Sequence, residues 1–260
     1  MLTRFSFLLL LAFVLQPAAA SAQAKIPRTP DGKPNFTGVW AGPGFAHVVG
    51  PGDTDSPRVT QYDPKNFAPY KPGGESLLRR KLTGNPRIDD PTAFCLPNGL
   101  TRQILSPYAQ QYIQSPTHMV ILYEYMHFFR GIPIGAPNRP HDPDVDLTWM
   151  GDAIGWWDGD TFVIDTVGLK EWMLDASLDL GGGTESKWHS DALHVVESLS
   201  FIDPTTVTYR VTIDDPKIFT APWSQNFQMK LHPTWKIFEF VCEENNRCEG
   251  GNCAESEVQK

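Results

Sequence analysis

The second half of the chain alternates between apolar runs and short turns, and this pattern restricts the fold more than any other feature. Its strongest unit runs from Trp149 to Val167, where Asp158-Gly159 separates an aromatic run from one rich in Val, Ile and Phe. Asp-Gly favours a tight hairpin because glycine accepts the positive φ that such turns need. Two further hairpins are predicted, from strands over 192–201 and 206–213 and over 227–231 and 235–242. Several short strands without a strong helix indicate an antiparallel sandwich or barrel.

The first residues have the composition of an export signal. Arg4 precedes an apolar run over 5–14, and small residues in an A-x-A pattern follow up to Ala22. This is the order of a secretory signal, and the apolar run is shorter than the ~20 residues that span a bilayer. We therefore expect cleavage after Ala22, with Ala24 as the alternative, and a periplasmic or secreted protein without membrane insertion. An uncleaved signal that serves as an anchor is the other possibility.

Residues 23–260 are expected to form a single β-barrel-like domain, because no low-complexity linker interrupts the second half. Proline interrupts helices and central strands. The segment 41–100 is therefore predicted to be an irregular wrap across the body or a cover over a pocket, with one or two helical turns near 75–82. Its prolines are at positions 43, 51, 57, 64, 69, 72, 86, 91 and 97.

Charge and missing motifs exclude several classes of function. Removal of residues 1–22 leaves 21 basic and 30 acidic residues, a formal charge of −9. Nucleic acids and anionic lipids require a basic surface, so neither is an expected partner. The chain has no G-x-S-x-G elbow, no P-loop and no G-x-G-x-x-G after a strand, and no cofactor is expected. The remaining functions are small-molecule binding and cofactor-free acid–base chemistry; the oligomeric state cannot be inferred from the sequence.

Four cysteines are consistent with an oxidising compartment: Cys95, Cys242, Cys248 and Cys253. They allow three connectivities, and the sequence does not choose among them. We prefer Cys95–Cys242, because Cys242 ends an apolar run and Cys95 lies in a proline-bounded turn; Cys248–Cys253 would then close a small polar loop. A metal site is disfavoured because no C-x-x-C pair is present.

Several motifs resemble known families. Gly38-Val39-Trp40 resembles the G-x-W start of lipocalin-like (calycin) barrels, which implies a mainly β, up-and-down antiparallel barrel behind the long Pro-rich irregular N-terminal segment. The wider pattern, DGKPNFTGVW, RGIPIG, WMGDAIGWWDGDTFVIDT, WHSDALHVVE and DDPKIFTAPW, is similar to a family of exported bacterial proteins without a settled activity. That resemblance covers most of the mature chain. Where the family has a DGRPHP-like turn, this chain has residues 136–141 without the Asp-Gly.

Strand periodicity selects the candidate catalytic residues. An acid in phase with apolar neighbours points to the apolar face, where it must be paired or have a raised pKa. Glu197 and Asp215 are in phase on neighbouring strands, and Glu124 shares a face with Arg130 in a predicted strand over 119–129. Glu124 and Arg130 are expected to pair, either as a structural ion pair or as part of an acid–base site. His189 lies at a loop-to-strand junction before Glu197, as a catalytic or a capping histidine.

Other polar and aromatic residues are candidate ligand contacts. His141 and Arg139 lie on one loop, and Asp152 begins the hairpin strand. Asp142, Asp144 and Asp146 match the start of a calcium loop, but its glycine and its glutamate are absent, so a solvated acidic loop is favoured. His189 and His194 lack a zinc pattern, and no metal is expected. An aromatic rim is predicted from Trp172, Trp188 and Trp223, which fall in or beside loops, and Trp157 is a separate candidate for lining the cavity.

These candidates support two hypotheses. The first is an exported barrel whose aromatic-lined cavity binds a small apolar or aromatic molecule. The second is a cofactor-free lyase or isomerase, in which His189, Glu197 and Asp215 transfer protons and Arg130 or Arg139 stabilises developing charge. A pure interaction module ranks third, behind these two. Convergence of these side chains within about 3–4 Å of a vacant volume would favour the second hypothesis.

Overall fold

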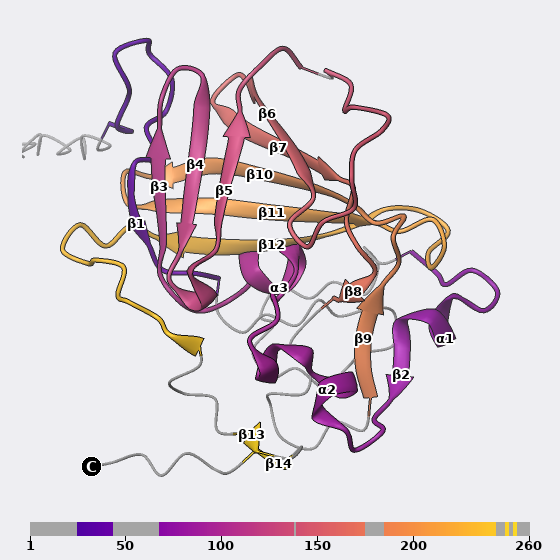
Figure 1. The fold of residues 1–260 in the computed structure, drawn as a ribbon. Helices are drawn as coiled ribbons and strands as arrows, with labels where there is room; N and C mark the ends of the chain where they lie inside the picture. The colour runs from indigo at the N-terminus through magenta and orange to yellow at the C-terminus, as the bar shows by residue number, and fades with distance from the viewer. Residues whose placement is uncertain are drawn as a thin grey trace, which may run out of the picture.

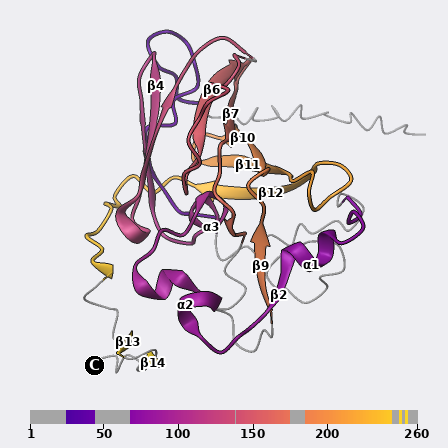
Figure 2. The same ribbon diagram turned by 45° about the vertical axis from the view of Figure 1, so that its right-hand side comes forward.

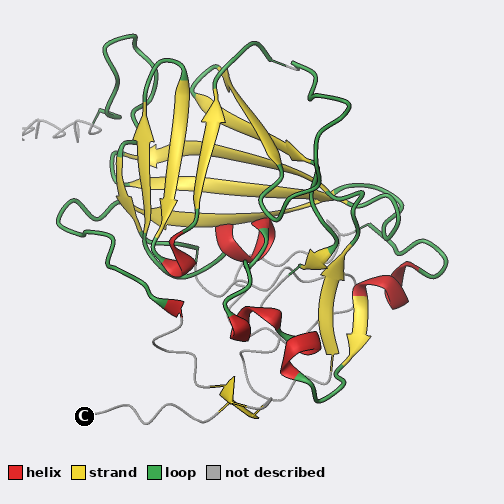
Figure 3. Ribbon diagram, in the orientation of Figure 1, coloured by secondary structure: helices red, strands yellow, loops and turns green. Residues whose placement is uncertain are grey.

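Strands dominate the part of the chain that the structure describes. The computed structural model describes residues 25–43, 68–137, 139–174, 185–242, 248–249 and 252–253. The helices are short and the large sheets antiparallel, so the prediction of a mainly β, antiparallel protein is confirmed (Figures 1 and 3). The expected signal sequence lies outside the described residues. None of the described helices has the length and hydropathy needed to cross a bilayer.

Two large sheets form the body. The four-stranded sheet has the order β1-β3-β4-β5, with the bounds Gly38–Trp40, Gln110–Gln114, His118–Tyr123 and Phe129–Pro133. The five-stranded sheet has the order β12-β11-β10-β7-β6. Its strands, in chain order, are β6 (Asp152–Asp158), β7 (Thr161–Val167), β10 (His194–Asp203), β11 (Thr206–Asp214) and β12 (Trp223–Lys230). Hairpin partners are neighbours in both sheets. The two hairpins predicted over 149–167 and 192–213 are therefore confirmed.

The two sheets do not form a closed barrel. In Figure 1 the strands of the four-stranded sheet cross those of the five-stranded sheet at a steep angle. Among the described residues, backbone pairing between the two sheets is limited to isolated bridges, from Trp40 to Leu231 at one side and from Ile134 to Gly155 at the other. The ladders cannot extend far, because β1 has three residues and β5 ends at Pro133, which has no N–H group. Among the described strands no sheet closes on itself, so the predicted barrel is not observed.

Side-chain alternation fills the space between the sheets. In β7 the buried residues Phe162, Ile164 and Thr166 alternate with partly exposed ones, as expected for a sheet with one face on the core. Both sheets contribute large buried side chains to one cluster, among them Trp40, Tyr112, Phe162, Tyr209 and Trp223. The sheets therefore enclose a packed core.

The proline-rich segment is more regular than predicted. Residues 44–67 lie outside the described residues. Residues 68–100 contain short elements, which are α1 (Gly74–Leu78), β2 (Arg79–Lys81), α2 (Pro86–Asp89) and the 3-10 helix η2 (Pro91–Phe94). β2 pairs with β9 (Glu185–His189), which also pairs with β8 (Trp172–Met173). Helix α3 (Leu100–Ile104) is wholly buried. In Figure 1, α1, α2 and this small sheet lie below the two large sheets, and Figure 2 shows α1 and α2 on either side of β9.

Two predicted strands are wrong. The apolar run 119–129 is a hairpin, because β4 ends at Tyr123 and β5 begins at Phe129 after the 3-10 turn η3 (Tyr125–His127). Met126 and His127 have left-handed φ values of 61° and 51°, which no glycine signals in the sequence. Residues 231–242 add no strand to a sheet, since beyond the bridge at Leu231 the segment crosses the surface without a ladder.

The preferred long-range disulfide is confirmed. Cys95 and Cys242 are bonded with a Cα–Cα distance of 5.7 Å and a sequence separation of 147. Farther along the chain, β13 (Cys248–Glu249) and β14 (Asn252–Cys253) pair so that Cys248 lies opposite Cys253. The Cys248–Cys253 bond stays a prediction.

Candidate functional site

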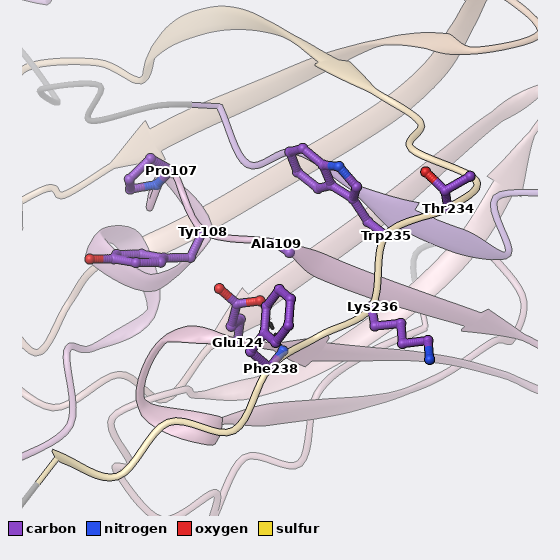
Figure 4. Close-up of a pocket in the computed structure, with 8 residues that line it drawn as sticks. All are labelled: Pro107, Tyr108, Ala109, Glu124, Thr234, Trp235, Lys236 and Phe238. Atoms are coloured by element: carbon purple, nitrogen blue, oxygen red, sulfur yellow. Dashed lines mark hydrogen bonds between the residues drawn. The ribbon is translucent and has the colours of Figure 1, made fainter. Parts of the chain in front are cut away.

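A surface groove of about 470 Å³ lies where the start of β3 meets the C-terminal segment 232–242. One wall comes from the residues around the β3–β4 pair and the other from the C-terminal segment, as Figure 4 shows. Its size is within the range of small-molecule sites. The lining residues are Pro107, Tyr108, Ala109, Glu124, Thr234, Trp235, Lys236 and Phe238.

Side chains of the β4–β5 turn hold the C-terminal wall in place. The Phe238 N–H donates to Glu124 Oε2 at 3.0 Å, and the Phe240 N–H donates to His127 Nε2 at 2.7 Å. The Phe240 ring also packs edge-on against Tyr125, at a centroid distance of 5.0 Å. Beyond these contacts, the disulfide at Cys242 joins the segment to Cys95. The strained turn at Met126 and His127 therefore positions the groups that build the groove.

Three large aromatic side chains of the groove are incompletely covered. Phe238 is 72% exposed, Trp235 45% and Tyr108 39%. Tyr108 stacks on Tyr125 with centroids 4.8 Å apart and an interplanar angle of 9°. Trp235 is stacked on His232 at 3.6 Å. The groove thus offers exposed aromatic surface, and two of its rings, Tyr108 and Trp235, are supported by a stacked neighbour. Its lining residues also include one carboxylate (Glu124) and one ammonium group (Lys236).

The predicted catalytic residues Arg130 and Glu197 form an ion pair inside the core. Arg130 Nη1 lies 2.7 Å from Glu197 Oε2, at an angle outside hydrogen-bond geometry, and both side chains are almost wholly buried. Arg130 Nη2 donates to Thr166 Oγ1, and the Tyr209 hydroxyl donates to Glu197 Oε1 at 2.6 Å. The predicted inward direction of Glu197 is confirmed. The predicted Glu124–Arg130 pair is wrong, because the turn after Tyr123 takes Glu124 out of phase and onto the surface groove.

Burial and mutual electrostatics shift the pKa values of the groups around the pair. Burial is the largest influence on the pKa of Arg130 and lowers it, but the attraction of Glu197 together with smaller contributions from Tyr123 and Tyr209 outweighs burial and leaves that pKa above its ordinary value. Burial and then repulsion from Glu197 raise the pKa of Tyr209 well above 10.0, and burial raises that of Tyr123 to about 12. These groups hold their charge states across the physiological pH range. The interior cluster therefore has the properties of a structural ion pair.

His189 and Asp215 are also buried, but in a second network. Asp215 accepts hydrogen bonds from the Ser190 N–H at 2.8 Å, from the Ser190 hydroxyl at 2.7 Å and from the Lys217 N–H at 3.1 Å. His189 Nδ1 donates to the Ser190 carbonyl, and its Nε2 has no hydrogen-bond partner among the described residues. Burial lowers the pKa of His189. The hydrogen bonds of Asp215 go to a turn, so the structure does not bring the predicted catalytic set to one site.

A chain of alternating carboxylates and imidazoles lies on the outer face of the five-stranded sheet. His141 Nδ1 is 2.7 Å from Asp152 Oδ2, and His141 Nε2 is 3.3 Å from Asp165 Oδ1. His194 Nε2 contacts the same Asp165 oxygen at 2.6 Å. The hydrogen bond to Asp165 raises the pKa of His194; burial raises that of Asp165, but the two histidines outweigh burial and lower it. The structure thus brings together His141 and Asp152, two of the predicted ligand contacts. The register of β7 and β10 places Asp165 and His194 in the same cluster.

The predicted aromatic rim is not observed. Trp223 is buried in the core, Trp157 packs against Phe36 and Phe162, and Trp188 is covered by Arg80 at 4.2 Å. None of the three lines the groove. Arg139 is exposed on its loop. Of the predicted ligand contacts only Glu124 lies in the groove. Sequence reasoning placed Trp235 in a core-facing strand and did not single out Tyr108, Lys236 or Phe238, and no local motif marks them.

Metal binding has no support in the described part of the chain. No group of three or more His, Cys, Asp or Glu side chains there is arranged to hold an ion. In the predicted acidic loop, Asp142 Oδ1 accepts the Asp144 N–H, and all three aspartates are exposed. The loop therefore has the features of a solvated turn.

Comparison with known proteins gives no relative. No family model, no curated protein and no solved structure matches this chain.

Proposed function

We propose that this protein binds a small apolar or aromatic molecule in the groove between β3 and the C-terminal segment. The observation that carries the proposal is the exposed aromatic wall formed by Tyr108, Trp235 and Phe238 around a volume of about 470 Å³. Covering apolar surface is worth roughly 25 cal/mol per Å², so a flat ligand gains affinity from each ring it contacts. The groove wall is already anchored by hydrogen bonds and a disulfide, which reduces the ordering cost of binding.

The proposal places the ligand outside the sheets. Large side chains fill the space between them, so the interior of the fold is not proposed as the cavity. The two bridged seams support a related proposal, that the sheets are the halves of an opened lipocalin-like barrel. Export to the periplasm or the medium, through the signal over 1–22, is proposed with it; a disulfide that joins distant segments is compatible with that location.

A matched pair of variants tests the site. Phe238→Ala removes a groove side chain that is 72% exposed, and Phe129→Ala removes one on β5 that is 69% exposed and does not line the groove. Binding of the neutral probe N-phenyl-1-naphthylamine is measured by its fluorescence on the oxidised mature chain. We expect Phe238→Ala to weaken binding about tenfold, or 1.4 kcal/mol, and Phe129→Ala to leave it unchanged. No binding by the parent chain, or equal loss in both variants, would refute the proposal.

A further inference from the structure

Glu124 is the feature of the groove that an apolar ligand alone does not explain. Its Oε2 accepts the Phe238 N–H, and no described cation pairs with its carboxylate. In Figure 4 the carboxylate lies between the rings of Tyr108 and Phe238, on the same side of the groove as the apolar lining. A carboxylate bordered by apolar surface is costly to desolvate unless an opposite charge meets it. Covering this groove with a neutral ligand would therefore leave a charge without a partner.

The aromatic lining, like the Glu124 carboxylate, favours a positively charged ligand. The faces of Trp, Tyr and Phe rings are the negative part of their quadrupoles and attract organic cations, with Trp the strongest. Tyr108, Trp235 and Phe238 are one of each type and come from two different segments around the same volume. Aromatic side chains grouped near a carboxylate form the kind of site that recognises alkylammonium groups. The ring surfaces and Glu124 therefore act together.

Lys236 is the one basic residue among the lining residues, and it opposes a cation. In Figure 4 its chain extends away from Trp235 and from the Glu124 carboxylate, so its ammonium lies at the far edge of the groove. Glu124, in contrast, is held in place by the Phe238 N–H. A fixed charge contributes more to recognition than one on a flexible stem, because less side-chain entropy is lost on binding.

We propose that the groove selects an organic cation, an alkyl- or arylalkylammonium whose apolar body contacts Trp235 and Phe238 and whose nitrogen lies against Glu124. This inference rests on the proposed function and names the class of its ligand. The ammonium group donates to the free acceptor capacity of the carboxylate and approaches the aromatic faces.

Three probes with a similar apolar body test the charge preference: 3-phenylpropylammonium, 3-phenylpropanol and 4-phenylbutanoate. Their dissociation constants are measured by titration calorimetry on the oxidised mature chain at pH 7. We expect the ammonium compound to bind at least tenfold more tightly than the alcohol, and the carboxylate to bind no better than the alcohol. Glu124→Gln, which keeps an acceptor for the Phe238 N–H, should abolish the preference and leave alcohol binding within threefold. Lys236→Met, which removes the one positive charge among the lining residues, should strengthen ammonium binding.

The outcomes separate the two proposals. Equal binding of all three probes, or a preference for the carboxylate that Lys236→Met removes, overturns the cation inference and leaves the groove as an apolar site. A preference for the ammonium compound that survives Glu124→Gln also overturns it. Failure of every probe to bind refutes the groove function itself. Near-ultraviolet circular dichroism of each variant confirms that the fold is retained.

Discussion

Two clusters of charged side chains lie on opposite faces of the same strands. Glu197 of β10 pairs in register with Ile164, and its neighbour Val196 pairs with Asp165 of β7. The two carboxylates are thus one register step apart, yet Glu197 faces the core and Asp165 the outer surface. The inner carboxylate contacts an arginine whose pKa is raised, whereas the outer one contacts His194 and raises the pKa of that imidazole above its ordinary value of 6.5. The face of the strand decides whether a carboxylate is structural or responsive to pH.

Breaking the buried Arg130–Glu197 pair should give the largest loss in the free energy of unfolding. Arg130→Met or Glu197→Leu alone leaves one buried charge without its partner, and we expect a loss of about 3–5 kcal/mol in the free energy of unfolding. The double variant Arg130→Met/Glu197→Leu removes both charges and should recover most of the loss, since apolar replacement of a buried pair is often neutral. Guanidinium unfolding followed by circular dichroism measures all three. Single variants that lose less than about 1 kcal/mol would contradict the structural role of the pair.

The cluster of histidines and aspartates on the outer face should have a smaller effect on the free energy of unfolding, and this effect should depend on pH. The folded-state pKa of His194 is raised above its ordinary value of 6.5 by Asp165, so protonated His194 stabilises the fold. That stabilisation is fully present below about pH 6.5 and is lost as the pH rises through the folded-state pKa. We expect His194→Gln to lower the unfolding free energy at pH 6 by about 1 kcal/mol or less, since the side chain is a third exposed, and to lose nothing at pH 9.

The measurement is urea unfolding at both pH values. Asp165→Asn is the companion variant, because it removes the acceptor that His141 and His194 share. It should show the same loss at pH 6. A His194→Gln effect that is equal at pH 6 and pH 9 would mean that the ring contributes packing only, and the contrast with the inner pair would disappear.

Sequence periodicity predicted the features that depend on strand alternation alone. Glu197 shares the period-two face of Val195 and Leu199, so the pattern was sufficient to predict the inward direction of Glu197. Its partner Arg130 is 67 positions earlier on the other sheet, and only the packing of the two sheets brings them together. Alternation failed at Glu124, where left-handed Met126 and His127 break a run that contains no glycine, proline or asparagine.

The groove could not be predicted for a related reason. Residues 235–242 are mostly apolar, which is typical of a strand, but a strand also needs a partner with unpaired backbone groups, and the sequence pattern does not show whether that partner exists. The disulfide was easier, because four cysteines restrict the choice to a few pairings. Of the groove residues, therefore, sequence reasoning found Glu124, and found it for the wrong reason.

The smallest effect on stability should come from an ion pair on the surface of the protein. Arg28 and Asp160 form a two-point contact, with Nη1–Oδ1 at 2.9 Å and Nη2–Oδ2 at 2.5 Å, which is good geometry on the β6–β7 turn. The Arg28 and Asp160 side chains are 42% and 60% exposed, so water and salt screen their attraction. We expect Arg28→Gln to leave the unfolding free energy unchanged within error in 0.15 M salt. Measured beside Arg130→Met, it isolates burial as the variable, because both arginines contact a carboxylate below 3 Å and only one is inside the core. A loss for Arg28→Gln comparable to that for Arg130→Met would show that contact geometry, rather than the face of the sheet, determines what these charges contribute.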